Sequence, residues 1–391
     1  MTTHRLRTFF AAIALVAVPF VSVVPARGAD TIKIGFSVSE TGSLAAPAIF
    51  QRQGYELAAD EQNAHGGLLG KKIELVHYDD QSTPSTAVSL YEKLLTDDKV
   101  DLVMGPYSSQ VTSAVAPVID RAKMTMPSMD ANPQPYDGSH PYLVQTIAQT
   151  GQYMAPVVDF AARHGVKTIA VLNQNSPFPQ ELARGIKAEA AKHNLTVVFE
   201  EAYPPSTTDF GPLVLKAAAA NPDAVICGTF LADAEGIVRA AKAQNMKAKM
   251  FAFSVGPVEP EFGSALGSAA NGIFGNTLWF PTLKTAGNAE FVKSFHAKYG
   301  RDPDYHAALS YAAMKLVIQA VQAVGSIDQD KIRAWLHGHT VETVMGPFKV
   351  SPTGLQIGYS AYVLQWQNGK QLLVWPQSNA NGSPVYPHPG W

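Results

Sequence analysis

Short apolar runs alternate with amphipathic segments through most of the chain. Apolar and polar residues alternate from Thr31 to Val38, which predicts a strand, and the helix that follows should end at Gly66-Gly67. The same alternation predicts strands at 31–38, 72–78, 100–104 and 124–126, and helices at 50–64, 84–95 and 109–121. Strands that alternate with helices indicate a parallel sheet covered by helices on both faces.

A second set of alternating elements begins near residue 168. Strands are predicted at 168–172, 196–200, 224–227 and 250–253, and the helices between them end near 193, 220 and 243. The C-terminal third adds a strand at 273–280, helices at 289–299 and 305–324, and a hairpin that turns at Asn368-Gly369. The chain therefore contains two successive α/β units of similar size.

The stretch from Asp101 to Ser109 is the strongest candidate for a binding site. A short apolar run ends at Gly105-Pro106, and Ser108 and Ser109 then stand where a helix should begin. The first N–H groups of a helix lack internal partners and favour negative charge, so two hydroxyls there suit a carboxylate. The alternative is that one serine only caps the helix.

The first residues have the pattern of a secretory signal peptide. Two arginines precede an apolar segment at 9–24 that Pro19 interrupts, and cleavage is expected after Ala26 or Ala29. No comparable apolar run is apparent later. We therefore expect a signal peptide over residues 1–29 and a periplasmic mature chain that is not inserted in a membrane.

Composition narrows the class of protein further. The 391 residues are 46% hydrophobic and 16% charged, with a formal net charge of -2, which favours globular domains with large cores and argues against nucleic acid as a partner. The single cysteine, Cys227, lies in a buried-strand pattern, so we expect a packed thiol and no internal disulfide.

The sequence lacks the common motifs of catalysis and cofactor binding. It has no H-E-x-x-H, no cysteine pair, no G-x-S-x-G, no G-x-G-x-x-G after the first strand and no Walker A lysine. Asp79-Asp80 at a strand end is more typical of a turn than of a catalytic pair. We therefore expect no metal, no cofactor and no enzymatic activity, with an exported α/β enzyme as the alternative of another class.

Five segments, taken in order, resemble the leucine/isoleucine/valine-binding branch of the type I periplasmic solute-binding proteins of ABC importers. They cover nearly the whole mature chain, and lie at 63–73, 105–109, 208–225, 299–303 and 365–370. The resemblance implies two Rossmann-like lobes joined by three crossover strands, with the ligand cleft between them. Lobe 1 would comprise residues 30–148 and 277–345, and lobe 2 residues 149–276 and 346–391.

The same resemblance implies the function and its partners. The chain would bind an amino acid or a related small carboxylate or amide, close around it by a hinge motion, and deliver it to an ABC permease with its ATPase. The binding protein is expected to be a monomer. An exported sensor domain without a transporter is a further alternative.

The resemblance assigns ligand-binding residues only at positions where this sequence matches the motifs of the family. Ser108 and Ser109, with Tyr107 before them, fall in the loop that holds the ligand carboxylate. The next loop, which supplies backbone and hydroxyl contacts, has Ala131 where a threonine is typical. The resemblance thus gives nine ligand-binding residues and no catalytic or metal-binding residue: Tyr107, Ser108, Ser109, Met129, Asp130, Ala131, Phe178, Phe230 and Ser254.

Ser254 departs from the family, because amino-acid binders tend to carry an acid there for the ligand ammonium. An unpaired buried charge costs several kcal/mol, so either another acid, such as Asp130, pairs with the ammonium or the ligand has no amine. An aromatic or other carboxylic acid without an amine is therefore the alternative ligand. The residues Phe253, Trp279 and Phe280 either line an aromatic cleft or pack in the core, and core packing is the more typical role.

Overall fold

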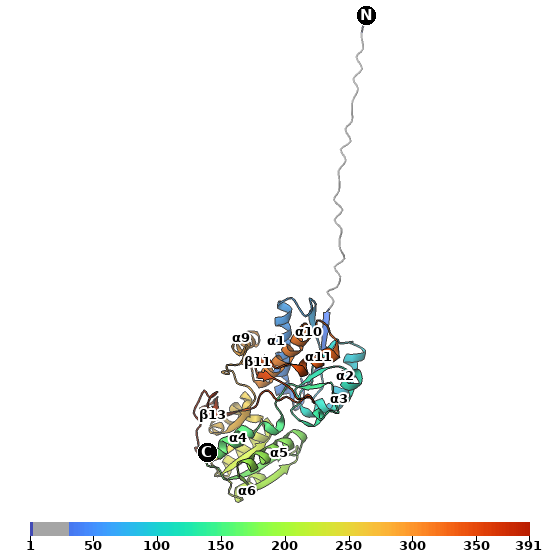
Figure 1. Cartoon of the computed structure of the whole chain (residues 1–391). Coiled ribbons are helices and arrows are strands. Elements are labelled where there is room, and N and C mark those ends of the chain that lie inside the picture. The colour runs from blue at the N-terminus through green and yellow to red at the C-terminus, as the bar shows by residue number, and fades with distance from the viewer. Residues whose placement is uncertain (3–30) are drawn as a thin grey trace. The chain divides into compact units, whose positions relative to one another are not determined.

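The computed structural model describes residues 1–2 and 31–391, so the predicted signal peptide lies almost entirely outside the described residues. Residues 31–391 form one compact unit. Its helices and strands alternate along most of the chain, and the predicted α/β class is confirmed (Figure 1).

A three-stranded parallel sheet is built from the first alternating set. β1 (Thr31–Val38) is its central strand and pairs with β2 (Lys72–Asp79) and β3 (Leu102–Val103). The helices that connect these strands to each other and to the next pair are α1 (Ala45–Ala64), α2 (Pro84–Thr96) and α3 (Ser109–Ala122). A separate parallel pair follows, made of β4 (Met126–Ser128) and β5 (Leu143–Gln145).

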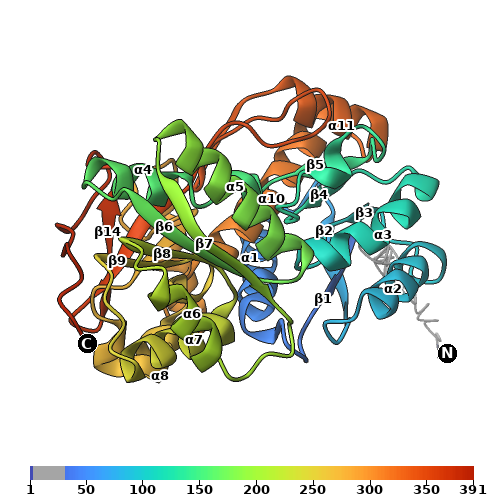
Figure 2. The same ribbon diagram turned by 90° about the horizontal axis from the view of Figure 1, so that it is seen from below.

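A seven-stranded mixed sheet is built from the second set, in the order β14-β13-β10-β9-β8-β6-β7. Helices cover both of its faces, with α4 and α5 on one side and α6, α7 and α8 on the other (Figure 2). The bounds are α4 (Ala155–Arg163), β6 (Thr168–Gln174), α5 (Pro177–Lys192), β7 (Thr196–Tyr203), α6 (Gly211–Ala219), β8 (Ala224–Gly228), α7 (Leu231–Ala243), β9 (Met250–Phe253), α8 (Pro260–Leu266), β10 (Phe274–Thr277), β13 (Tyr362–Gln367) and β14 (Lys370–Trp375).

The chain between β10 and β13 returns to the first sheet. It forms α9 (Asn288–Tyr299), α10 (Tyr305–Val324), α11 (Gln329–Gly338) and the antiparallel pair β11 (Val341–Thr343) and β12 (Gly346–Phe348). Helix α10 packs along α1, and Gly54 allows the close approach, because a Cβ there would collide with the carbonyl of Ala307 and the hydroxyl of Ser310.

Helix α10 is also a correction to the sequence analysis. It has 20 residues and a mean hydropathy of 1.4 over its most apolar window, so it is long and apolar enough to cross a membrane. In the structure 72% of that window is buried, and the helix is a core element of the compact unit.

Several element boundaries differ from the prediction. Helix α1 begins at Ala45 rather than near residue 50, since Pro47 lies in the first turn, where its missing N–H needs no partner. Strand β3 is shorter than predicted, and β4 begins and ends two residues later than predicted. The sequence analysis missed β5, α4, α8, α11, β11 and β12.

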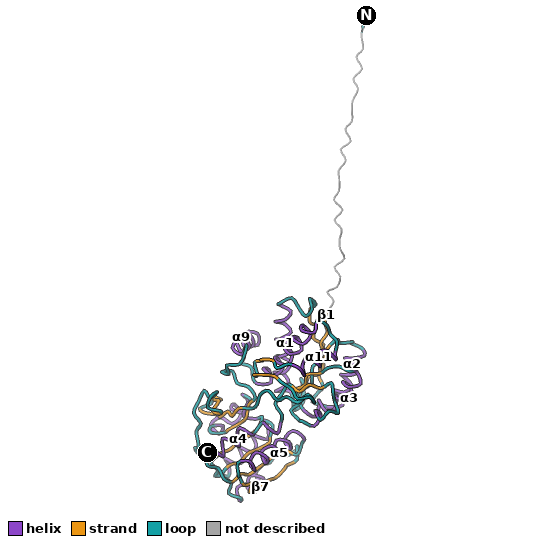
Figure 3. Tube along the Cα trace, in the orientation of Figure 1, coloured by secondary structure: helices purple, strands orange, loops and turns teal. Residues whose placement is uncertain are grey.

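The C-terminal hairpin is confirmed, with Asn368 and Gly369 both at positive φ between β13 and β14. The chain after β14 has no helix or strand (Figure 3), yet it is anchored. The Trp391 indole N–H donates to the Met246 carbonyl at 3.1 Å, and the His388 backbone N–H donates to the Lys249 carbonyl at 2.8 Å.

Candidate functional site

The turn after β3 is held by two buried side chains from α1. The amide of Gln51 donates to the Gly105 carbonyl at 2.9 Å, and the hydroxyl of Tyr55 donates to the same oxygen at 3.1 Å. A Cβ on Gly105 would lie 2.9 Å from the Ser128 Cα, so only glycine lets the ends of β3 and β4 approach this closely. The two loops predicted to bind ligand are therefore adjacent.

The two serines at the start of α3 have different roles. Ser108 is the N-cap, with φ at 75°, and its hydroxyl accepts a hydrogen bond from the Val111 N–H at 3.4 Å. Ser109 is the first helical residue, and only 5% of it is exposed. The capping role thus belongs to Ser108, and the buried Ser109 hydroxyl lies beside the first-turn N–H groups.

Asp130 lies next to Ser109 and is fully buried. Its Oδ1 accepts the Asn132 backbone N–H at 2.8 Å, whereas its Oδ2 has no hydrogen-bond partner among residues 31–391. Burial raises the pKa of this carboxyl to about 7, although the neighbouring Ser109 hydroxyl and the Asn132 N–H both act to lower it. A substantial fraction of the Asp130 carboxyl is therefore protonated at neutral pH.

Met129 and Ala131 flank Asp130 and are both buried. The carbonyl of Ala131 accepts the Thr150 N–H at 2.7 Å, and the carbonyl of Asp130 accepts the Gln145 amide at 2.9 Å. These bonds fasten the loop to the segment that leads into α4.

Tyr107 is the first member of a buried polar chain. Its hydroxyl lies 3.2 Å from Nε2 of His306, and Nδ1 of His306 lies 2.7 Å from Oδ2 of Asp304, the N-cap of α10. Burial, together with the charges on Glu259 and Asp304, holds the pKa of Tyr107 well above its usual range. The phenol is therefore neutral at physiological pH.

Phe178, in the first turn of α5, and Phe230, the N-cap of α7, meet in the structure. Their ring centroids are 5.6 Å apart, and Tyr153 makes an edge contact with Phe178 at 5.7 Å. Burial raises the pKa of Tyr153 well above its usual range, and the phenols of Tyr359 and Tyr107 and the charge on Asp130 add to this rise, so Tyr153 lies near the two ligand loops. Trp279, by contrast, packs against Phe291 in the core, as expected.

Ser254 connects the ends of two neighbouring strands. Its hydroxyl donates to the Thr229 carbonyl at 2.7 Å and accepts the Thr229 N–H at 2.9 Å. The residue is fully buried. Its hydroxyl is thus already engaged by the protein.

Glu259 is a buried acid that the sequence analysis missed. It follows β9 by six residues, is 5% exposed, and its carboxylate has no hydrogen bond or ion pair with any described residue of the compact unit. Burial and the charges of Asp304, Glu261 and Glu235 raise its pKa to about 8. One feature of the sequence could have indicated this residue. Glu259 is an acid between the apolar Val258 and Pro260, five residues after the predicted site residue Ser254.

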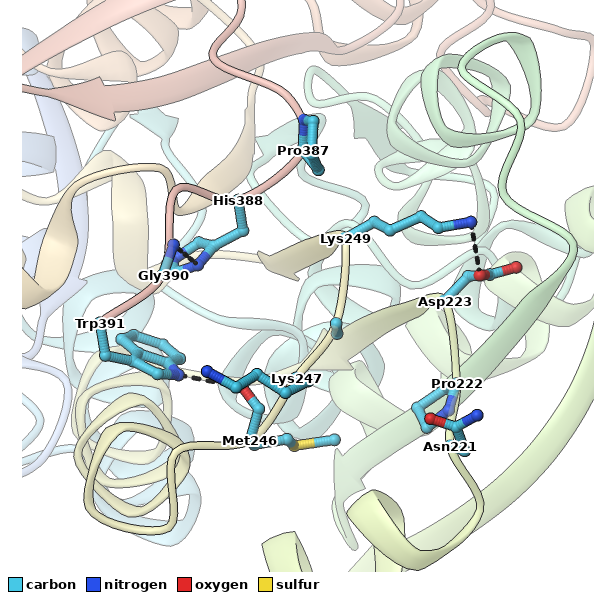
Figure 4. A pocket seen from close by; sticks show the side chains of 11 residues that line it. Asn221, Pro222, Asp223, Met246, Lys247, Lys249, Pro387, His388, Gly390 and Trp391 are labelled. Carbon is cyan, nitrogen blue, oxygen red and sulfur yellow. Dashed lines mark hydrogen bonds and ion pairs between the residues drawn. The ribbon is translucent and has the colours of Figure 1, made fainter.

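Two pockets open elsewhere on the surface. One, of about 260 Å³, is lined by residues of the loops before β8 and β9 and by the C-terminal tail, including Asp223, Lys249 and Trp391 (Figure 4). The other lies beside β2 and the end of α1. Neither is lined by a predicted ligand-binding residue. In residues 31–391 no group of three acidic, histidine or cysteine side chains is arranged to hold a metal ion.

The comparisons with known proteins identify the family. The family model for periplasmic binding proteins matches residues 31–371. This chain belongs to the periplasmic binding protein family. The predicted type I periplasmic binding protein fold is confirmed, and membership implies an extracytoplasmic location. The boundaries of the two predicted lobes stay a prediction.

Relatives of this binding protein are known from several bacteria. It is 27% identical to the leucine-, isoleucine-, valine-, threonine- and alanine-binding protein of Pseudomonas aeruginosa, over 93% of this chain and 96% of the relative. It is 26% identical to the branched-chain amino acid transporter substrate binding protein LivJ of Streptococcus pneumoniae, solved in complex with isoleucine, with a TM-score of 0.79 over 92% and 100% of the two chains.

A third comparison bears on the fold. A solute binding protein of an ABC transporter from R. palustris, solved in complex with benzoate, has a TM-score of 0.78 and 23% identity over 91% of this chain and 98% of its own. The predicted branch of the family is confirmed by the relatives that carry Leu/Ile/Val-binding names.

Proposed function

We propose that this protein is the extracytoplasmic ligand-binding subunit of an ABC importer for amino acids or related small carboxylates, and that it delivers its ligand to a permease and ATPase. The observation that carries the ligand class is the buried Ser109 hydroxyl at the N-terminus of the 14-residue helix α3. Unpartnered N–H groups and a hydroxyl stabilise a carboxylate there. The names of the relatives at 26–27% identity support an amino acid.

A thermal-shift screen of amino acids, amides and aromatic acids tests the ligand class. A ligand present at 100 times its Kd stabilises the folded state by about 2.7 kcal/mol. The variant Ser109→Ala should then weaken binding about tenfold or more, since a hydrogen bond to a charged group contributes roughly 1.5–3 kcal/mol. The exposed Ser113, one turn later on α3, gives the control variant Ser113→Ala. Equal affinities of both variants by calorimetry would contradict the carboxylate site.

The ammonium of an amino acid needs a different partner from Ser254. Glu259 is buried, lacks a partner among the described residues, and interacts electrostatically with Tyr107 of the ligand loop. An ammonium beside this carboxylate would satisfy both charges. We therefore assign the recognition of the amine to Glu259.

Comparing leucine with 4-methylpentanoate, which has the same side chain and no amine, tests this assignment. Glu259→Gln should weaken leucine binding at least tenfold and leave 4-methylpentanoate unaffected, because only leucine loses an ion pair. Glu261→Gln, an exposed acid two residues away, is the control. If Glu259→Gln changes both affinities equally, Glu259 does not recognise the amine.

The second candidate is a carboxylic acid without an amine. The aromatic cluster of Tyr153, Phe178 and Phe230 favours it, because such rings suit a flat apolar ligand. Tight binding of benzoate or 4-methylpentanoate, with no binding of leucine or isoleucine, would establish this function instead.

A further inference from the structure

The proposed carboxylate site contains an acid where a base would be expected. Asp130 is fully buried beside Ser109. A ligand carboxylate at Ser109 and an ionised Asp130 would be two adjacent anions in a site shielded from water. Two carboxylates in such a position cannot both ionise without a cation between them.

The described surroundings of Asp130 hold no cation that would relieve this repulsion. The hydroxyl of Ser109 faces it from α3, and the N–H of Asn132 faces it from its own loop. The titratable groups that interact with its charge are the phenols of Tyr136, in the 3-10 helix Gln134–Tyr136, and of Tyr153, which precedes α4. Burial keeps both phenols neutral, so neither supplies a positive charge.

The hydrogen bonds of Asp130 decide which oxygen would carry a proton. Oδ1 accepts the Asn132 N–H at 2.8 Å and needs a lone pair for it. Oδ2 is buried and has no partner among residues 31–391. A buried polar atom without a partner is costly, and a proton on Oδ2 would turn it into a donor on a carboxyl that interacts with the Ser109 hydroxyl.

We propose that Asp130 is neutral in the complex, carries its proton on Oδ2, and donates a hydrogen bond from this atom to the carboxylate of the bound ligand. This inference rests on the proposed function, because it requires a carboxylate at Ser109. Above the pKa of the free acid, binding takes up one proton from solvent. Asp130 thereby selects carboxylates and excludes an ammonium from this end of the site.

Wild-type protein gives the first test without any substitution. Isoleucine and benzoate are titrated by calorimetry between pH 6 and 9 in buffers with different enthalpies of ionisation. The affinity for benzoate should fall about tenfold per pH unit above about pH 7, with uptake of close to one proton. For isoleucine, Glu259 must ionise to pair with the ammonium, and the proton it releases offsets this uptake until the pH exceeds about 8, above which the same fall should appear. Binding that is independent of pH, or that releases a proton at Asp130, overturns the proposal.

The variant Asp130→Asn separates the two possible roles of this residue. Asparagine keeps an acceptor for the Asn132 N–H and a donor at the other position, so the fall in affinity above about pH 7 should disappear in this variant. In Glu259→Gln, which removes another buried acid with a raised pKa, the fall in affinity above about pH 7 should persist. A tenfold or greater loss of isoleucine binding in folded Asp130→Asn would show that an ionised Asp130 binds the ammonium.

Failure of the proposed function has a different signature. If no acid or amino acid stabilises the protein at any pH, the carboxylate site itself is wrong. The protonation of Asp130 is still measurable then, because wild type should lose stability relative to Asp130→Asn as the pH rises from about 5 to 8. An unchanged difference across this range overturns the neutral Asp130.

Discussion

The hydroxyl of Tyr107 lies 3.2 Å from Nε2 of His306, although 199 residues separate the two in the sequence. Through this contact the ligand loop is joined to the first turn of α10, whose N-cap, Asp304, holds the other ring nitrogen of His306. The conformation of the loop therefore depends on a helix from a distant part of the chain.

Tyr107→Phe should destabilise the protein by about 1–3 kcal/mol, because it leaves the buried His306 nitrogen without its partner. Urea unfolding monitored by circular dichroism measures the change. Tyr362→Phe is a matched control, since its partly buried hydroxyl has no hydrogen bond to a described side chain or backbone group in the compact unit. A loss no larger than that of the control would mean that the Tyr107–His306 contact does not contribute.

Ser254→Ala should also lower the free energy of unfolding by about 1–3 kcal/mol. The reason is that the N–H and the carbonyl of Thr229 would both lose their hydrogen-bond partner in a buried site. The ratio of leucine to 4-methylpentanoate affinity should stay constant. Ser264→Ala, at an exposed position of α8, is the control for stability. A changed affinity ratio would show that the Ser254 hydroxyl contacts the ligand amine, contrary to its structural role.

Gly54→Ala should destabilise the protein by about 1–3 kcal/mol or more, since the new methyl group would press α1 against the backbone of α10. Gly338→Ala makes the same change near the end of α11, where nothing lies within 4 Å of the added Cβ. The control substitution Gly338→Ala should leave the free energy of unfolding unchanged or raise it slightly. Similar unfolding midpoints for the two variants would contradict the tight α1–α10 contact.

Glu259 should make the unliganded protein less stable as the pH rises. Its folded pKa, about 8, lies above the ordinary 4.5, so ionisation is disfavoured in the folded state. Its contribution is fully present below about pH 4.5 and is lost as the pH rises through about 8. Thermal unfolding from pH 5 to 9 should show a smaller loss in Glu259→Gln than in wild type. Parallel curves for the two proteins would refute this assignment.

The sequence predicts local features of the fold well, because strand periodicity and turn residues are local signals. Thr31–Val38, the Asn368-Gly369 hairpin and the buried Cys227 are all found as predicted. Strand β5 and helix α4 were missed, since β5 has only three residues and pairs with β4 only in the folded chain. Such short elements exist because of tertiary pairing and carry little signal of their own.

The contacts around the candidate site could be predicted less completely from the sequence, for the same reason. The position of Ser109 follows from strand, turn and helix signals within ten residues. The partners His306 and Glu259 lie far away in the sequence, and nothing local distinguishes His306 from a core histidine or Glu259 from a surface acid. Their burial and their proximity to Tyr107 arise only when distant segments come together.

Helix α10 is the core of this protein, and its composition also matters before folding. A segment of this length and apolarity resembles a stop-transfer sequence, which an export channel releases sideways into the bilayer. Lys315 is the only Lys, Arg, Asp or Glu in α10, and its Nζ lies 3.6 Å from Glu61 in the folded protein. A lysine near the middle of a helix raises the free energy of membrane insertion by about 2.5–3.5 kcal/mol. This single charge therefore opposes insertion of the helix into a bilayer before the helix is buried in the folded protein.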